Sequence, residues 1–259
     1  MHAPTPAKSR DLQSIAAAVA DRVSYFRSAT AAPASEGWHL CADLLSHPAA
    51  LHELIGSTAA GRGAPDLPVA ASLFVQAYAF RVPSVALGAF ALGLPTPCIA
   101  PGMTAIAIAR HRPAQVAYLD SQLDEPDATT LAQAIADHLG QLLAAIRSVI
   151  NVGERLLWGN VAASCATAFR AIEGASVEKD RPSIRTRAEA FFQAADFGGF
   201  ASAGRFETVE EGTKNGWYWT RTNCCLWYQT TSGSRCDDCS LFTPAELLAI
   251  RVAQLQGTG

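Results

Sequence analysis

Apolar residues recur every three or four positions along most of this chain, which is the spacing of an amphipathic helix. The longest such stripe follows Asp127, where Leu131, Ile135, Leu139 and Leu142 share one helical face. The same period predicts further helices over residues 11–30, 38–45, 48–55, 69–80, 83–94, 158–172 and 184–195. Residues 56–68 are rich in small and turn-forming types, so we predict a loop there.

Several shorter regions alternate with a period of two and predict strands. Residues 104–109 and 115–118 predict a hairpin with a turn longer than two residues. Near the C-terminus, residues 205–209, 217–222 and 226–229 predict short strands, and residues 243–246 form a capping-box pattern that opens a closing helix. We therefore expect a mostly helical α+β fold, with small antiparallel β regions in the middle and near the C-terminal cysteine motif.

The change of character after Pro97 predicts two regions, a helical one at 1–97 and an α+β one at 98–259 that carries the cysteine motif at 224–239. Of the 259 residues, 49% are hydrophobic and 17% are charged, which is a globular composition. The formal net charge is −3 and no run of Lys or Arg occurs, which argues against a nucleic-acid partner.

Two features bear on the compartment. The first 13 residues are polar and do not form an apolar signal core. The most hydrophobic stretch, residues 69–94, is interrupted by Gln76, Arg81 and Pro83, and each half is shorter than the ~20 apolar residues that a spanning helix needs. We expect no membrane span and a cytoplasmic protein, in a compartment where thiols stay reduced.

Four of the seven cysteines lie close together near the C-terminus. Cys224 and Cys225 are adjacent, and Cys236 and Cys239 form a C-x2-C. An iron–sulfur cluster, a structural zinc or disulfides would each explain such a group. Residues 232–234, Ser-Gly-Ser, predict a turn that brings Cys236 back toward Cys225.

The adjacent pair helps to rank these explanations. Neighbouring side chains on an extended backbone point to opposite faces, so Cys224 and Cys225 reach one centre only where the backbone bends sharply. Zinc sites usually separate paired ligands by two to four residues, whereas a two-iron cluster spreads four thiolates over a larger body. A vicinal disulfide would be strained. Spacing therefore favours iron–sulfur, then zinc, then disulfides or inert thiols.

The pattern C-C-x10-C-x2-C, with Tyr228 after the pair, Asp238 before the last cysteine and Arg221 before the first, resembles the ferric-siderophore reductase family, the FhuF-like proteins. The motif resemblance covers residues 219–241. Residues 158–160, Trp-Gly-Asn, also resemble a recurring element of that family. Gln229 and Asp237 depart from the family pattern and make the surroundings of the cysteines less positive, which weakens the case for an anionic chelate.

The resemblance implies a [2Fe–2S] cluster held by Cys224, Cys225, Cys236 and Cys239. It implies an oxidoreductase that reduces a ferric siderophore by one electron and releases Fe(II) in the cytoplasm, with peripheral attachment to the inner membrane as a variant. The hydroxamate type is one candidate substrate. An external protein such as a ferredoxin or a reductase would supply the electron, because the chain has no dinucleotide fingerprint and no Walker sequence.

The electron transfer itself needs no acid–base or covalent residue. The candidate substrate-binding residues are Arg221, Trp219, Tyr228, Trp158 and Asn160, although most aromatic residues near the cysteine pair are expected to shield the cluster.

The alternative reading is a zinc-stabilised helical binding module without redox activity. The other cysteines, 41, 98 and 165, are interpreted as core residues. The group His39, Cys41, His47 and His52 has no recognised metal-site spacing.

Overall fold

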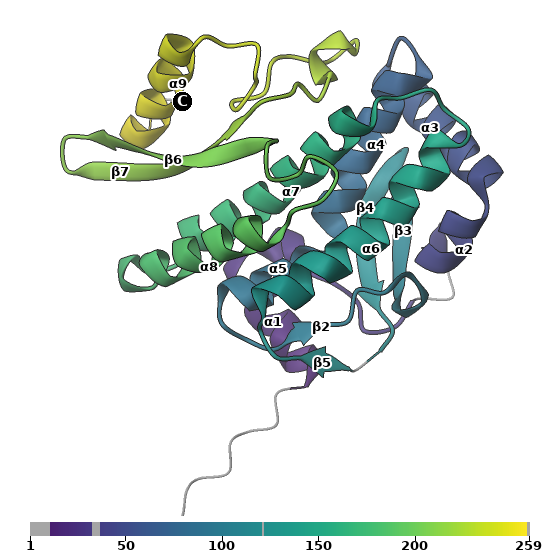
Figure 1. Cartoon of the computed structure of the whole chain (residues 1–259), viewed down its shortest axis with the longest axis horizontal. Coiled ribbons are helices and arrows are strands. Elements are labelled where there is room, and N and C mark those ends of the chain that lie inside the picture. The colour runs from purple at the N-terminus through teal and green to yellow at the C-terminus, as the bar shows by residue number, and fades with distance from the viewer. Residues whose placement is uncertain (1–10, 33–36, 121, 258–259) are drawn as a thin grey trace, which may run out of the picture.

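The computed structural model describes residues 11–32, 37–120 and 122–257. Helices hold 56% of the chain and small antiparallel sheets 15%, which confirms the expected mostly helical α+β fold (Figure 1). The first ten residues of the polar N-terminus lie outside the described part. The α-helices are α1 (Leu12–Arg22), α2 (Cys41–Ser46), α3 (Pro48–Arg62), α4 (Leu67–Arg81), α5 (Ser84–Ala91), α6 (Ala128–Arg147), α7 (Glu154–Gly174), α8 (Arg181–Ala194) and α9 (Pro244–Gln256).

Within the described residues, the strands form three small antiparallel sheets. The first has the order β1-β3-β4, with β1 (Trp38–Leu40), β3 (Thr104–Ala109) and β4 (Arg112–Tyr118). The second pairs β2 (Thr96–Pro97) with β5 (Leu123–Asp124), and the third pairs β6 (Gly204–Glu211) with β7 (Lys214–Arg221). The expected β regions in the middle and near the cysteines are therefore confirmed.

Helices α4 and α7 pack together at the centre of the fold. Helix α4 is buried over most of its circumference, as expected for a helix that is apolar on nearly all sides. One hydrophobic cluster extends from Leu12 to Trp219, so residues on both sides of position 97 share a core, and the predicted boundary there stays a prediction. Among the described residues no single helix is long and apolar enough to cross a membrane, and only α4 with α5, bent by 47°, meets that criterion as a pair.

Several predicted boundaries were wrong. Residues 38–40 are a strand and not the start of a helix, because they pair with β3. The predicted loop at 56–68 is mostly helical, since α3 continues to Arg62 and ends at Gly63, whose left-handed φ of 60° suits glycine. The first helix stops at Arg22, and Ala29 instead bridges to Ala117 of β4.

Two turns also differ from expectation. The hairpin turn between β3 and β4 has only two residues, because Ala109 pairs with Arg112 and both Arg110 and His111 have positive φ. Residues Trp227–Gln229 form a 3₁₀ helix and not a strand.

The long helix after Asp127 and the closing helix are confirmed, with Asp127 as an N-cap and Thr243 in a complete capping box.

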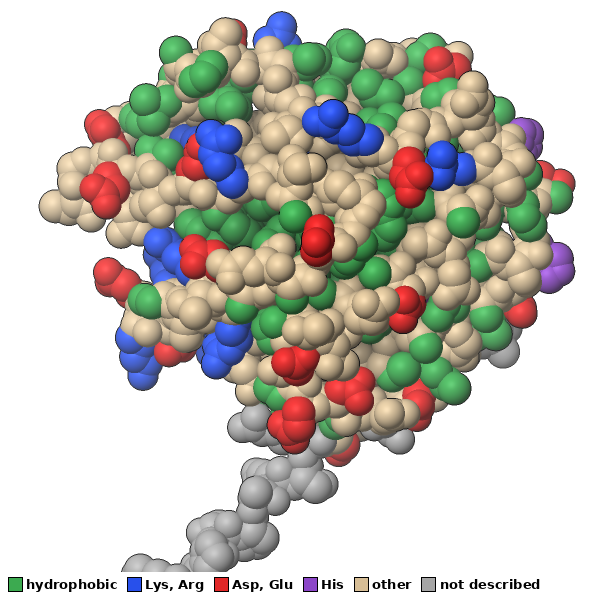
Figure 2. All heavy atoms as spheres, viewed as in Figure 1, with side chains coloured by type: hydrophobic (Ala, Val, Ile, Leu, Met, Phe, Trp, Pro, Cys, Tyr) green, Lys and Arg blue, Asp and Glu red, His purple; other side chains and the backbone are tan. Residues whose placement is uncertain are grey.

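The β6–β7 hairpin and α9 form a C-terminal unit that lies over α7 and α8 (Figure 1). Arg251 of α9 joins helix to hairpin through an ion pair with Glu207 at 2.7 Å and a hydrogen bond to the Thr220 hydroxyl at 2.6 Å. Arg170 of α7 donates to the Trp217 carbonyl at 2.9 Å. On the face in Figure 2, acidic side chains gather along the lower edge, whereas basic and acidic side chains are interspersed over the upper part and the left side.

A buried histidine in the helical body makes stability depend on pH. The His138 Nδ1–H donates to the Ile99 carbonyl at 2.5 Å, so Nε2 accepts the Tyr78 hydroxyl at 2.8 Å. Burial lowers the pKa of His138 to about 4 from 6.5. The unfolded chain takes up this proton at higher pH than the folded chain, so stability present above about pH 6.5 declines as the pH falls toward 4.

Because of this histidine, we expect the free energy of unfolding to be about 2 kcal/mol lower at about pH 5 than at neutral pH. Urea unfolding of the wild type and of His138→Gln at both pH values measures the effect. The variant should lose less stability on acidification, and an equal loss in both proteins would contradict the assignment.

Candidate metal centre

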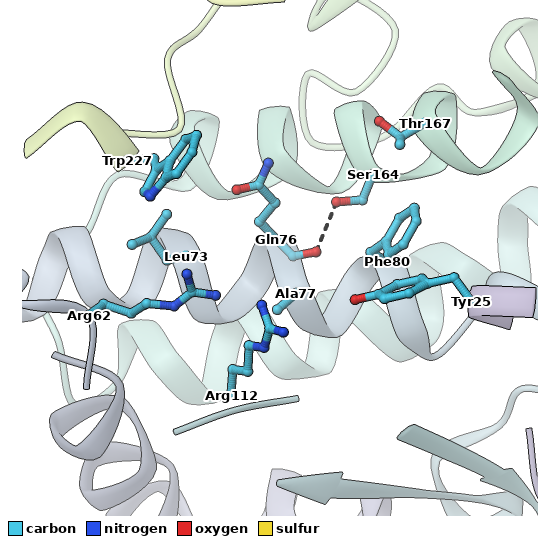
Figure 3. A pocket seen from close by; sticks show the side chains of 10 residues that line it. All are labelled: Tyr25, Arg62, Leu73, Gln76, Ala77, Phe80, Arg112, Ser164, Thr167 and Trp227. Atoms are coloured by element: carbon cyan, nitrogen blue, oxygen red, sulfur yellow. Dashed lines mark hydrogen bonds between the residues drawn. The ribbon is translucent and has the colours of Figure 1, made fainter. Parts of the chain in front are cut away.

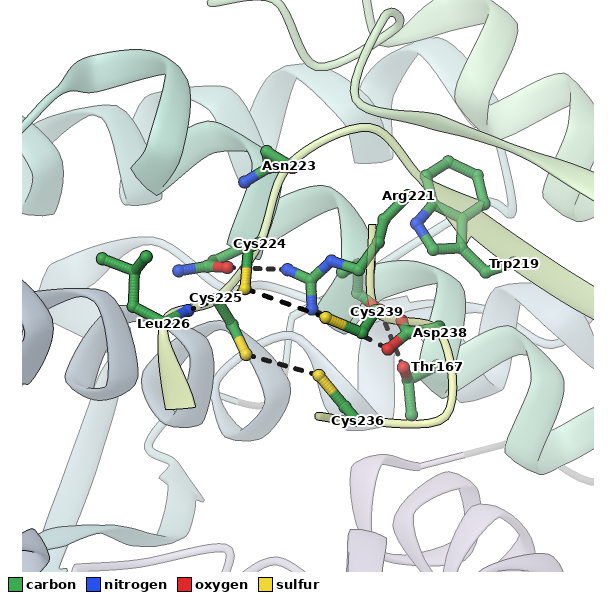
Figure 4. Close-up of polar contacts among 12 residues, drawn as sticks. Thr167, Trp219, Arg221, Asn223, Cys224, Cys225, Leu226, Cys236, Asp238 and Cys239 are labelled. Atoms are coloured by element: carbon green, nitrogen blue, oxygen red, sulfur yellow. Dashed lines mark hydrogen bonds and ion pairs between the residues drawn. The ribbon is translucent and has the colours of Figure 1, made fainter. Parts of the chain in front are cut away.

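The four motif cysteines lie on the segment between β7 and α9 (Figure 4), which contacts α4 through Ser72 and α7 through Leu156. The backbone bends directly after the adjacent pair, where Leu226 has a left-handed φ of 67°. A second turn follows at Gly233, whose Cα faces the Trp227 carbonyl so closely that no Cβ fits there. These two turns bring the C-x2-C back to the adjacent cysteines, as predicted from the Ser-Gly-Ser sequence at residues 232–234.

The sulfur atoms meet in two pairs. The Cys224 Sγ lies 3.9 Å from the Cys239 Sγ, and the Cys225 Sγ lies 3.5 Å from the Cys236 Sγ (Figure 4). A disulfide bond would be about 2.05 Å long, so the thiols of both pairs are free. The adjacent cysteines thus have different partners.

Each of these separations suits two thiolates that bind the same tetrahedral metal ion. Two thiolates on one tetrahedral ion, with metal–sulfur bonds of about 2.3 Å, stand about 3.8 Å apart. Both observed distances lie close to that value. Among the described residues, no group of three or more His, Cys, Asp or Glu side chains is arranged to hold a metal ion.

The thiols share negative charge unequally. The neighbouring thiols of Cys224 and Cys236 lower the pKa of the Cys225 thiol, and the Arg221 guanidinium lowers it further. The neighbouring Cys225 thiol, together with burial, raises the pKa of Cys224 and of Cys236. One thiolate therefore forms readily, whereas ionising Cys224 and Cys236 as well requires additional positive charge, which metal ions would supply.

A chain of buried hydrogen bonds supports the first cysteine pair. Arg221, with a side chain only 1% exposed, donates to the Asn160 Oδ1 at 2.8 Å. The Asn160 Nδ2 donates to the Ser72 Oγ at 2.7 Å, and the Ser72 hydroxyl donates to the Cys225 carbonyl at 2.7 Å. Arg221 also lies 3.9 Å from the Asp238 carboxylate. Residues of β7, α7 and α4 thus hold the backbone on either side of the thiols.

The Trp158-Gly159-Asn160 element is part of the same support. Asn160 is the central member of the hydrogen-bond chain. The Gly159 Cα faces the side chain of Asn223, which donates to the Leu156 carbonyl at 3.2 Å and directly precedes Cys224. A Cβ on Gly159 would overlap that side chain. The glycine therefore allows the cysteine segment to lie directly against α7.

We expect Gly159→Ala to displace Asn223 and to lower the free energy of unfolding by about 1–3 kcal/mol, because the overlap breaks a hydrogen bond next to Cys224. Gly56→Ala is the matched control, since Gly56 also lies in a helix and an added Cβ there would have no neighbouring atom within 4 Å. That control should be neutral or more stable by about 0.5–1 kcal/mol. Urea unfolding measures both variants, and equal stability of the two would contradict this packing.

The other predicted site residues are placed differently. Trp219, Trp158 and Asn160 are buried, and Trp219 packs against Phe192 and Phe206. Tyr228 is 42% exposed and is the most accessible of the candidates. Binding of substrate by these residues stays a prediction, and of the buried ones Asn160 and Arg221 belong to the hydrogen-bond chain beside the cysteine segment. Of the remaining cysteines, 41 and 165 are buried in the core and 98 is half-buried.

Two pockets adjoin the cysteine segment, and the sequence indicated neither. One of about 240 Å³ includes Cys236 and Asp238 in its wall. The other, of about 290 Å³, is lined by ten residues that include Arg62, Arg112 and Trp227 (Figure 3). The two arginines come from α3 and β4, far from the motif in sequence, so no spacing rule could have found them.

Sequence comparisons do not extend the motif resemblance. It rests on the cysteine segment and the Trp158-Gly159-Asn160 element, which the structure brings into contact through Arg221 and Asn223. Membership of the ferric-siderophore reductase family therefore stays a prediction. Comparison of the whole chain with protein-family models and with curated proteins finds no match.

Proposed function

We propose that this protein is an iron–sulfur oxidoreductase that reduces a ferric siderophore by one electron and so releases Fe(II). The observation that carries the proposal is the arrangement of four free thiols in two facing pairs, at 3.9 and 3.5 Å. Cys224 with Cys239 would hold one iron of a [2Fe–2S] cluster, and Cys225 with Cys236 the other. Such a cluster, when bound, accepts and donates single electrons.

The chain's own residues would fix the thiols and control their surroundings. The hydrogen-bond chain from Arg221 to the Cys225 carbonyl holds the adjacent pair, and the Leu226 amide donates to the Cys224 Sγ at 3.4 Å. Donors to sulfur and nearby positive charge raise the reduction potential of such sites, whereas ligation by thiolates alone favours the lower end of the range.

The substrate step is a simple electron transfer. The chelated Fe(III) gains one electron and becomes Fe(II), which hard oxygen ligands hold less tightly because its charge density is lower. An external donor protein would replace the electron, and the reaction would take place in the cytoplasm. No bond to the protein forms or breaks.

The test is metal analysis of protein purified without oxygen. We expect brown protein with equal amounts of iron and acid-labile sulfide, a paramagnetic signal after reduction, and Fe(II) formation from a ferric siderophore when an electron donor is present. Colourless protein that contains zinc, or a disulfide between motif cysteines, would contradict the proposal and favour a structural role for the thiols.

A further inference from the structure

The larger pocket beside the cysteine segment is cationic. The guanidinium groups of Arg62 and Arg112 point into it from two different elements (Figure 3). None of its ten lining residues is Asp or Glu. In the part of the chain that the structure describes, neither arginine has an ion pair or a side-chain hydrogen bond. Two half-buried positive charges therefore share one space without a protein counter-charge.

Keeping these charges together without an anion is unfavourable. Burial lowers the pKa of Arg62, and the nearby charge of Arg112 lowers it further. Burial and Arg112 also lower the pKa of Arg81, but Arg81 has partners, since it stacks 3.3 Å from the Tyr25 ring centre and donates to the Tyr25 carbonyl. An anionic ligand in the pocket would relieve the repulsion between Arg62 and Arg112.

The rest of the lining is aromatic or neutral. Tyr25, Phe80 and Trp227 contribute ring faces and edges, which suit an aromatic or aliphatic portion of a ligand. A guanidinium group matches paired oxygen atoms such as those of a carboxylate or a catecholate. At about 290 Å³ the pocket is at the small end for ligand sites, so it would hold one arm of a larger molecule.

The pocket is also next to the thiols. Trp227 lies two residues after Cys225, and Gln76 and Thr167 line both this pocket and the smaller one that contains Cys236. A molecule held between Arg62, Arg112 and Trp227 would thus lie beside the Cys225–Cys236 pair.

We infer that this pocket binds a negatively charged arm of a ferric chelate, so the preferred substrates are anionic chelates with carboxylate or catecholate oxygens, and not neutral or cationic hydroxamate chelates. This inference rests on the proposed reductase function. It reverses the expectation drawn from Gln229 and Asp237, because the positive charge comes from distant parts of the sequence.

Redox-inert Ga(III) chelates separate binding from reduction. The probes are the Ga(III) complexes of a tricatecholate, of citrate and of desferrioxamine B, and isothermal titration calorimetry of the full chain measures their affinities. We expect one or both anionic complexes to bind at least about tenfold more tightly than the cationic desferrioxamine complex, and the preference to weaken as salt is added. Preference for the tricatecholate over citrate would show that the aromatic lining contributes.

Arg62→Gln and Arg112→Gln should each weaken binding of the anionic complexes by about tenfold and leave the desferrioxamine complex unaffected. Arg147→Gln is the control, since this arginine lies at the end of α6 and is paired with Glu154. Equal affinities for anionic and cationic complexes, or unchanged binding in both pocket variants, would overturn the inference.

The two proposals fail in different ways. Protein without iron that still prefers anionic Ga(III) chelates would contradict the reductase function alone. Iron-loaded protein that reduces hydroxamate chelates, with pocket variants as active as the wild type, would contradict the pocket assignment alone.

Discussion

Serine in place of Cys225 is expected to reduce bound iron and acid-labile sulfide at least tenfold and to remove the visible absorption. The thiol is 2% exposed and faces Cys236 at 3.5 Å, so one sulfur pair loses a ligand. A serine hydroxyl is close in size to a thiol, but it ionises far less readily than a cysteine and is therefore a poor ligand for iron. The measurement is iron and sulfide content per chain, with the absorption spectrum of the same sample.

Cys98→Ser is the matched control, because Cys98 is a half-buried cysteine outside the motif. This variant should keep its iron, its sulfide and its colour. Circular dichroism of both variants tests whether the helical body remains folded, which we expect because the core lies mainly in the helices before residue 200. Full iron content in Cys225→Ser would rule out the assignment of this thiol as a ligand.

Removing the charge of Arg221 is expected to make the reduction potential of the proposed cluster more negative by on the order of 100 mV. The Arg221 charge acts on the Cys225 thiolate. A unit charge about 4 to 8 Å away contributes about 2 to 4 kcal/mol at an effective dielectric constant of about 20, and about 59 mV corresponds to a tenfold change for one electron. The positive charge favours the reduced state, which carries one more electron, so its loss favours the oxidised state. Redox titration of Arg221→Gln measures the shift.

Two further variants separate charge from structure. Arg221→Lys keeps the charge and loses the guanidinium geometry that reaches both Asn160 and Asp238. Its reduction potential should therefore lie close to that of the wild type, whereas its free energy of unfolding should stay below the wild-type value. Asn160→Ala leaves the guanidinium without its amide partner and should lower the free energy of unfolding by about 2–3 kcal/mol. A potential in Arg221→Gln equal to that of the wild type would contradict an electrostatic role.

Local pattern was sufficient for the long elements. Helix α6 was predicted from its stripe of apolar residues and its N-cap Asp127, and both are set by neighbouring positions in the chain. Parts of strands β6 and β7 were predicted from the alternation of side chains between two faces, whereas their pairing as a hairpin comes from the structure. Elements stabilised by distant partners were missed. Strand β1 has three residues and exists because it pairs with β3, and the extension of α3 to Arg62 depends on packing against α4.

The candidate site also has some features that the sequence predicts and others that only the structure shows. Four thiols and the turn between them could be recognised from spacing, because the segment that carries them is short and continuous. Which sulfur faces which could not be recognised, since it depends on the bends at Leu226 and Gly233. The role of Ser72 had no sequence signal, because a serine within an apolar helix is compatible with simple burial.

The sequence by itself determined the mostly helical α+β class, the presence of β regions in the middle and near the cysteines, and the identity of the candidate metal-binding thiols. These follow from the periods of helix and strand and from the chemistry of cysteine, which act over a few residues. Only the tertiary structure decided the pairing of the sulfurs, the burial of Arg221 against Asn160, and the meeting of Arg62 with Arg112 beside Trp227. Those contacts join segments that are far apart along the chain. Burial and charge repulsion depend on the distance between groups in space, which the sequence separation of two residues does not reveal.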